Sequence, residues 1–137
     1  QYFIKKYLYP IPCKLGPLIA SHVNSMKDIS DGLIGDLTDM LNGKYGALIN
    51  VNKIPVSVKT KKILNFKNNF RIENLLNAGD DYGLIIISSQ KNRNKIFSIA
   101  YKNNIKISCI GKIIREKGIH FDSHLDIKNL KKFDHFS

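Results

Sequence analysis

The sequence predicts an α+β fold in which a mixed β-sheet of about four strands is layered with helices. Its 137 residues make a single domain, residues 1–137, which is long enough to bury a hydrophobic core. Hydrophobic residues make up 43% of the chain, a share typical of globular proteins. Short β-branched runs alternate with segments of helical spacing, and no repeat or long linker interrupts them.

The first helix is predicted within residues 15–26, after a proline-punctuated entry. Apolar residues and one histidine recur there at helical spacing, which gives one buried face. These residues are Leu15, Leu18, Ile19, His22, Val23 and Met26. The stretch MKDIS at 26–30 then predicts a short strand or the end of one.

A second helix is predicted between Ser30 and Gly43. Ser30 can accept a backbone hydrogen bond as the N-cap, and Gly43 can close the helix. The buried stripe consists of Leu33, Ile34, Leu37, Met40 and Leu41. The same spacing places Asp36 and Asp39 on the polar side of this helix.

The remaining elements continue the alternation of strands and helices. Runs of β-branched residues predict buried strands, and apolar residues three and four apart predict helices. Strands are expected at 45–51, 82–89, 105–114 and 118–122, helices at 71–79 and 91–104, a loop stiffened by Pro55 at 53–57, and a partly helical, exposed stretch at 59–69.

The chain is strongly basic, with 22 Lys and Arg against 11 Asp and Glu and a net charge of +11. Such a surface concentrates polyanions, so nucleic acid and phosphate are candidate partners. Only Arg71, Arg93 and Arg115 are arginines, and the lysines are scattered without an RNA-binding aromatic signature. This composition disfavours nucleic-acid binding. The clusters at 59–62 and 131–132 are expected to be solvated faces.

The composition also limits the compartment. No apolar run approaches the roughly 18 residues that cross a bilayer, so no membrane association is expected. Cys13 and Cys109 are too few and too far apart for a disulfide framework, which favours a reducing cytoplasm. Gln1 stands where a Met would begin a chain, and no signal-peptide pattern follows it. The chain is therefore expected to be an internal piece of a longer protein.

Four aspartates fall within twelve positions of the stretch at 26–41. Asp28 and Asp31 lie three apart across the predicted strand-to-helix junction, and Gly32 follows. Free N–H groups at a helix start suit a phosphate, and a Mg²⁺ ion would reconcile the phosphate with the two carboxylates. The alternative is structural: Asp31 complements the helix dipole, worth about 0.3–1 kcal/mol, while Asp28 caps a turn. The spacing alone does not decide between the magnesium site and the structural roles.

A second acidic turn, NAGDDYG, occupies residues 77–83. Asp80 and Asp81 are adjacent like charges, which cost free energy unless a cation or ligand compensates them. Both acidic turns are predicted at the ends of strands, where ligand sites in layered folds gather. Together they favour a ligand site that includes a cation.

Six short motifs occur in series along the chain: DISDGL, GALI, IPVS, AGDDY, CIGKI and FDHF. In this order and spacing they resemble the C-terminal half of the thiamine-monophosphate kinase family, within the superfamily of aminoimidazole ribonucleotide synthetase. The opening YLYPIPCKLG resembles that family's lead-in as well. The resemblance covers essentially the whole chain and implies the α+β fold of that superfamily's C-terminal domain.

This resemblance implies a kinase that uses aspartate-bound Mg²⁺ to hold ATP and transfers the γ-phosphate directly to thiamine monophosphate, giving thiamine diphosphate. The chain has neither a P-loop nor a protein-kinase signature. By their places in the motifs, Asp28 and Asp31 correspond to magnesium-binding aspartates and Ser30 to a nucleotide-contacting serine. Asp80 corresponds to an acidic residue that contacts the substrate, and Phe133 to an aromatic residue that packs on the thiamine moiety.

The resemblance further implies a partner segment. In that family the N-terminal half binds ATP, supplies further aspartates and forms a homodimer. These 137 residues match only the C-terminal half, so they are expected to be inactive alone.

The chain departs from the family pattern at several positions. Ala78 and Gly83 replace a glycine and a glutamate of the second acidic motif, and Tyr9 replaces an arginine of the lead-in. The pair CK follows Pro12 in place of an arginine. These departures are expected to affect the affinity for substrate more than the fold.

Other residues and other functions remain as alternatives. His120 and His124 have a metal-like spacing, but they fall in a predicted strand and loop, so structural roles are expected. Cys13 and Cys109 are expected to be buried thiols, and His135 could act at the site or pack the tail. The alternative functions are another ATP-using member of the same superfamily, such as a hydrogenase-maturation protein, and a basic nucleic-acid-binding module.

Overall fold

The computed structural model describes residues 4–5, 13–66, 72–76 and 83–123. In chain order its elements are α2 (Leu15–Ile19), η1 (Ala20–His22), β1 (Ser25–Asp28), α3 (Leu33–Leu41), β2 (Gly46–Ile49), η2 (Val51–Lys53), α4 (Val58–Phe66), α5 (Ile72–Leu76), β3 (Leu84–Ile87), η3 (Gln90–Asn92), α6 (Arg93–Lys102), β4 (Gly111–Ile114) and β5 (Gly118–Phe121). None of the described helices is long and apolar enough to cross a membrane.

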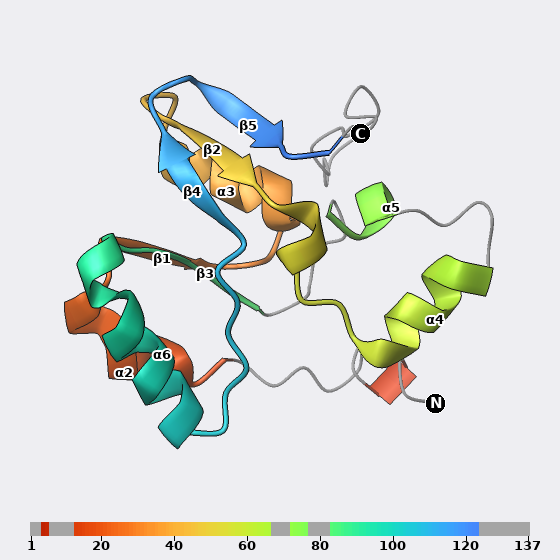
Figure 1. Cartoon of the computed structure of the whole chain (residues 1–137), viewed down its shortest axis with the longest axis horizontal. Coiled ribbons are helices and arrows are strands. Elements are labelled where there is room, and N and C mark those ends of the chain that lie inside the picture. The colour runs from red at the N-terminus through yellow and green to blue at the C-terminus, as the bar shows by residue number, and fades with distance from the viewer. Residues whose placement is uncertain (1–3, 6–12, 67–71, 77–82, 124–137) are drawn as a thin grey trace.

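The described strands form two small sheets. β1 pairs antiparallel with β3, with Ser25 opposite Ile87 and Asp28 opposite Leu84. In the other sheet β2 is central, antiparallel to β4 and parallel to β5. Figure 1 shows the three-stranded sheet above the pair of β1 and β3, with α2 and α6 on the other side of that pair. The α+β class is confirmed, with five strands in two sheets where the sequence predicts about four.

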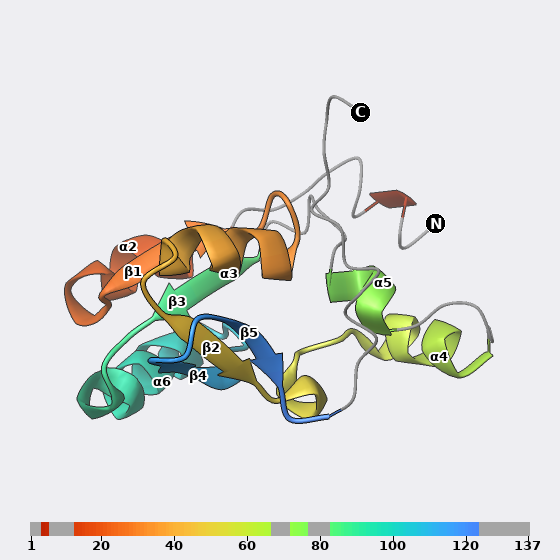
Figure 2. The same cartoon turned by 90° about the horizontal axis from the view of Figure 1, so that it is seen from above.

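Strand β3 separates two hydrophobic clusters. Successive side chains of a strand point to opposite faces, so a run of four apolar residues can serve two cores. Ile85 and Ile87 pack with α3 and β2, whereas Leu84 and Ile86 pack with α2 and α6. In Figure 2 β3 runs between α3 on one side and α6 on the other. The part of the predicted buried run that forms β3, Leu84–Ile87, is therefore covered on both faces.

The first predicted helix is shorter than its apolar spacing suggests. The α-helix ends at Ile19 and a 3₁₀ turn ends at His22, after which Val23 is extended. Met26 belongs to β1 and pairs with Ile86. The positions of Val23 and Met26 fit a helical stripe by spacing alone, but pairing with β3 determines their conformation.

The predicted strand at 105–114 is also shorter, because only Gly111–Ile114 pairs with β2. The Asn50 N–H donates to the Ile110 carbonyl at 2.7 Å, and beyond Asn50 the chain leaves β2 and enters η2. Among the described residues, no strand pairs with the residues before Ile110. They continue as a single chain down to α6 (Figure 1).

Candidate functional site

The turn between β1 and α3 contains the first acidic motif. Gly32 is the N-cap of α3, with φ of 91°, a conformation that favours glycine. Its carbonyl accepts the first helical hydrogen bond, from the Asp36 N–H at 3.0 Å. Ser30 therefore precedes the cap, and the prediction that it caps the helix is wrong. Asp31 likewise precedes the first helical turn.

Asp36 anchors this turn from inside the protein. Its side chain is fully buried, and its Oδ2 accepts the N–H groups of Ser30 at 2.8 Å and Asp31 at 2.9 Å. Its Oδ1 forms an ion pair of 2.7 Å with Lys27 Nζ from β1. The prediction that Asp36 lies on the polar side of α3 is wrong, because the turn folds back over the first helical turn and covers it. The two N–H groups are consequently occupied and are not open to a phosphate.

Asp36 and Lys27 each stabilise the charged form of the other. Burial by itself would raise the pKa of Asp36, but Lys27 and the N–H groups of Asp31 and Ser30 outweigh it and lower that pKa below its ordinary value. Asp36 and then Asp39 raise the pKa of Lys27, against partial desolvation. Both groups are therefore charged at neutral pH.

Asp31 and Asp39 complete an acidic cluster around Asp36. One carboxylate oxygen from each of these three residues lies within 4.8 Å of the others. Asp39 is exposed, and its Oδ2 accepts a hydrogen bond from Lys27 Nζ at 3.1 Å. Lys27 thus neutralises part of the cluster from the Asp36 and Asp39 side, while Asp31 lies in the turn itself.

Asp28 lies apart from this cluster. It follows Lys27 directly in β1, and the two residues alternate between exposed and half-buried sides of the strand. Within the described part of the chain its carboxylate accepts no hydrogen bond, so the alternative that Asp28 caps a turn is not supported. Ser30 is exposed as well. The motif therefore presents Asp28 and Ser30 to solvent and Asp31 at the edge of the cluster.

Asp80 and Phe133 lie outside the described residues, as do Ala78, His124 and His135. The described neighbour of the second acidic turn is Gly83, whose carbonyl accepts the Ile29 N–H at 2.9 Å. The chain therefore enters β3 at the same end of the sheet where it leaves β1. The expectation that each acidic turn lies at the end of a strand holds for these two described flanking residues, Ile29 and Gly83.

Sequence reasoning missed the role of Asp36, although a signal was present. Asp36 lies in the first turn of a helix, directly before the buried Leu37. It follows a glycine-containing turn whose backbone N–H groups need hydrogen-bond acceptors. A carboxylate at such a position can reach back to those N–H groups.

The other candidate residues have local partners. His120 Nε2 lies 3.0 Å from the Lys117 carbonyl and 3.9 Å from Glu116 Oε1. Cys13 and Cys109 are free, half-buried thiols. The contacts of His120 agree with the structural role expected for it, whereas the two thiols are half-buried where buried thiols were predicted.

The family model described as AIR synthase related protein, C-terminal domain, matches residues 6–123. The thiamine-monophosphate kinase of Buchnera aphidicola subsp. Schizaphis graminum (strain Sg) is 43% identical over 148 residues, which cover 99% of this chain and 43% of that protein. The chain therefore spans less than half of the length of this curated relative.

Two solved structures share the fold. The crystal structure of thiamine-monophosphate kinase from Stenotrophomonas maltophilia K279a has a TM-score of 0.74 at 24% identity, covering 86% of this chain and 37% of that one. The structure of AaThiL complexed with AMPPCP and TMP has a TM-score of 0.72 at 22% identity, covering 97% of this chain and 39% of the other. Both likenesses support the α+β architecture described above.

Proposed function

This chain belongs to the family of AIR synthase related proteins, as their C-terminal domain, and from this premise we propose that it forms the C-terminal part of a thiamine-monophosphate kinase. The proposed reaction is the ATP- and Mg²⁺-dependent phosphorylation of thiamine monophosphate to thiamine diphosphate. The similarity to a named thiamine-monophosphate kinase along 99% of the chain supports the choice within the family.

One observation carries the proposal: Asp36 fixes the turn that contains Ser30 and Asp31. Its two hydrogen bonds, of 2.8 and 2.9 Å, hold the backbone of both residues at the end of β1. The side chains of Ser30 and Asp31 then extend from an anchored backbone, which is the preorganisation that phosphoryl transfer needs. Asp28 reaches solvent from the adjoining strand end.

The donor set suits Mg²⁺. This ion binds through one or two carboxylates and completes its shell with water and phosphate oxygens. Asp28 and Asp31 would hold it, and Ser30 would contact the nucleotide. Asp36 and Asp39 are engaged with Lys27, so we assign them to the support of the turn. When bound, Mg²⁺ would neutralise charge on the phosphates.

The acceptor side of the reaction rests on two residues outside the described part. We propose that Asp80 contacts thiamine monophosphate and that Phe133 packs on its thiamine moiety. The charge neutralisation still missing would come from an N-terminal half of the same protein, which would bind ATP and form a homodimer. We place the enzyme in the cytoplasm, where free thiols such as Cys13 and Cys109 persist.

Reconstitution tests this proposal. The chain is fused behind the N-terminal half of the Buchnera relative, and formation of thiamine diphosphate is measured with and without ATP and Mg²⁺. A fusion of the relative's own two halves is the matched control. We expect turnover by the fusion and none by the 137-residue chain alone. An inactive fusion beside an active control would overturn the proposed function, and robust turnover by the chain alone would show that the nucleotide site is misplaced.

A further inference from the structure

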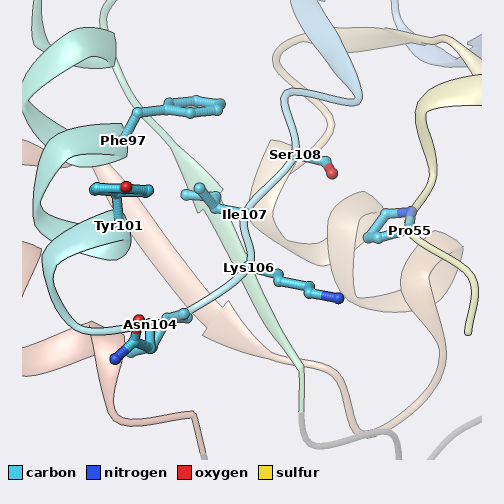
Figure 3. A pocket seen from close by; sticks show the side chains of 8 residues that line it. Pro55, Phe97, Tyr101, Asn104, Lys106, Ile107 and Ser108 are labelled. Atoms are coloured by element: carbon cyan, nitrogen blue, oxygen red, sulfur yellow. The ribbon is translucent and has the colours of Figure 1, made fainter.

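A groove lies between α6 and the segment that leaves it, and the proposed kinase site does not use it. Its volume is about 530 Å³, and it is lined by Phe97 and Tyr101 of α6, by Pro55, and by residues 104–108. Figure 3 shows Ile107 pointing toward the two aromatic rings, whereas Lys106 and Ser108 point the other way, toward Pro55. The segment is thus extended, with side chains on alternate sides.

The backbone of this segment has no partner in the described part of the chain. The last backbone bond before it is Ile105 N–H to the Ala100 carbonyl at 2.9 Å, and the next is the one that the Ile110 carbonyl accepts from Asn50. Between them, residues 106–109 make no backbone hydrogen bond to a described residue. Ile105 and Ile107 pack into the cluster of α2 and α6, so the segment is held in place while its backbone polar groups are unpaired among the described residues. An extended backbone of this kind is a template for another strand.

The walls of the groove offer aromatic surface. Tyr101 is 84% exposed, an unusual amount for so large a side chain. Phe97 is half-buried, and the Arg93 guanidinium lies over its ring, 5.8 Å from the centroid. An apolar side chain of a partner would cover both rings.

The stretch of chain that forms α6 and the extended segment carries charge of one sign. Residues 82–115 contain no Asp or Glu, although they contain seven basic residues. These are Lys91, Arg93, Lys95, Lys102, Lys106, Lys112 and Arg115. The positive charge that the structure places at the groove, from Lys106 in its lining and Arg93 over Phe97, attracts an acidic segment and disfavours a basic one. It also opposes pairing with a second copy of the same surface.

From these features we propose that the groove binds an extended acidic peptide segment of a partner protein, which adds as a strand along residues 106–109. Its backbone would bond the open N–H and carbonyl groups. Alternate carboxylates would face Lys106 and Ser108, and the apolar side chains between them would cover Phe97 and Tyr101. Single-stranded nucleic acid could use the aromatic rings and the lysines, but it cannot form a strand ladder with the open backbone.

The test uses fluorescence anisotropy with the 137-residue chain, three labelled peptide probes and an oligothymidylate competitor. The first probe is the peptide Glu-Val-Glu-Val-Glu, the second is Lys-Val-Lys-Val-Lys, and the third is the acidic peptide N-methylated at alternate amides. We expect the acidic peptide to bind and the other two to bind at least about tenfold more weakly. Lys106→Glu should weaken the acidic peptide about tenfold and improve the lysine peptide, whereas Lys95→Glu should change both less than about threefold, because Lys95 lies outside the groove lining.

Three results would overturn the proposal. The first is no binding of the acidic peptide. The second is equal binding of the N-methylated peptide, which would mean attraction of charge without strand addition. The third is an oligothymidylate that binds more tightly than the peptide and displaces it, which would assign the groove to nucleic acid.

Discussion

Lys27 of β1 and Asp36 of α3 form an ion pair of 2.7 Å that joins the end of a strand to the first turn of the following helix. Asp36 is fully buried and Lys27 is 32% exposed, so Lys27 lies on the solvent side of the buried carboxylate. Through its second oxygen Asp36 also holds the turn that contains Ser30 and Asp31. One carboxylate therefore connects the stability of the domain to the placement of the proposed magnesium site.

Removal of the Asp36 charge should destabilise the domain. Asp36→Asn loses the ion pair and weakens the acceptor for two N–H groups, and leaves Lys27 with Asp39 alone. We expect a loss of about 2–3 kcal/mol in the free energy of unfolding, because two hydrogen bonds to a buried charged acceptor are weakened and the ion pair is lost. Urea denaturation measures it. Asp39→Asn is the control, since Asp39 is exposed and an exposed pair contributes about 0–1 kcal/mol. Equal losses in the two variants would contradict the anchoring role.

The same carboxylate should give the domain a characteristic acid sensitivity. The pKa of Asp36 in the folded protein lies below its ordinary value of 3.8. Below that value the unfolded chain binds a proton that the folded chain does not, so stability falls as pH falls. The difference in unfolding free energy between wild type and Asp36→Asn should be constant above about pH 5 and should shrink below about pH 4. A difference that stays constant down to pH 2 would show that the group has no depressed pKa.

Two glycines should respond differently to alanine. A Cβ on Gly46 of β2 would lie 1.8 Å from the Glu116 carbonyl oxygen, which is backbone and cannot move aside. A Cβ on Gly16 of α2 would meet Met26 Sδ at 3.7 Å, an ordinary contact. We expect Gly46→Ala to cost about 2 kcal/mol or more, and Gly16→Ala to change the stability by less than about 1 kcal/mol, because the gain in helix propensity is opposed by contact of the new Cβ with the ring of Pro17. Thermal denaturation of both variants measures these effects. A Gly46→Ala variant as stable as the wild type would contradict the close approach of β2 to the turn before β5.

Phe133 should affect one substrate more than the other. If its ring packs on the thiamine moiety, the contact contributes about 0.5–2 kcal/mol through cation–π attraction and buried area. Phe133→Ala in the fused enzyme should then raise KM for thiamine monophosphate by about 2- to 30-fold and leave KM for ATP nearly unchanged. Equal increases in both KM values would indicate a packing role.

Local patterns predicted much of the fold because several elements are fixed by their own sequence. The helix at 33–41 follows from its apolar spacing, and the strand at 84–87 from its β-branched run. Pairing between distant segments was not predictable in this way. Met26 fits a helical stripe by spacing, yet it lies in β1 because it pairs with Ile86.

The candidate site was predictable only where it depends on local sequence. The motif that contains Asp28, Ser30 and Asp31 stands out as a strand-to-helix junction, and the structure places it at one. The burial of Asp36 depends on how the turn folds back and on Lys27, nine positions earlier on another element. The open backbone of residues 106–109 likewise depends on where β2 ends. Asp80 and Phe133 remain predictions.

The most direct measurement of the central claim is the turnover of the fused enzyme with Asp31→Asn. If Asp31 holds Mg²⁺ against the nucleotide phosphates, kcat should fall about 100-fold or more while the denaturation midpoint changes little. Glu116→Gln, which removes an exposed carboxylate from the turn between β4 and β5, should leave kcat within about threefold. Near-wild-type turnover by Asp31→Asn would contradict the account.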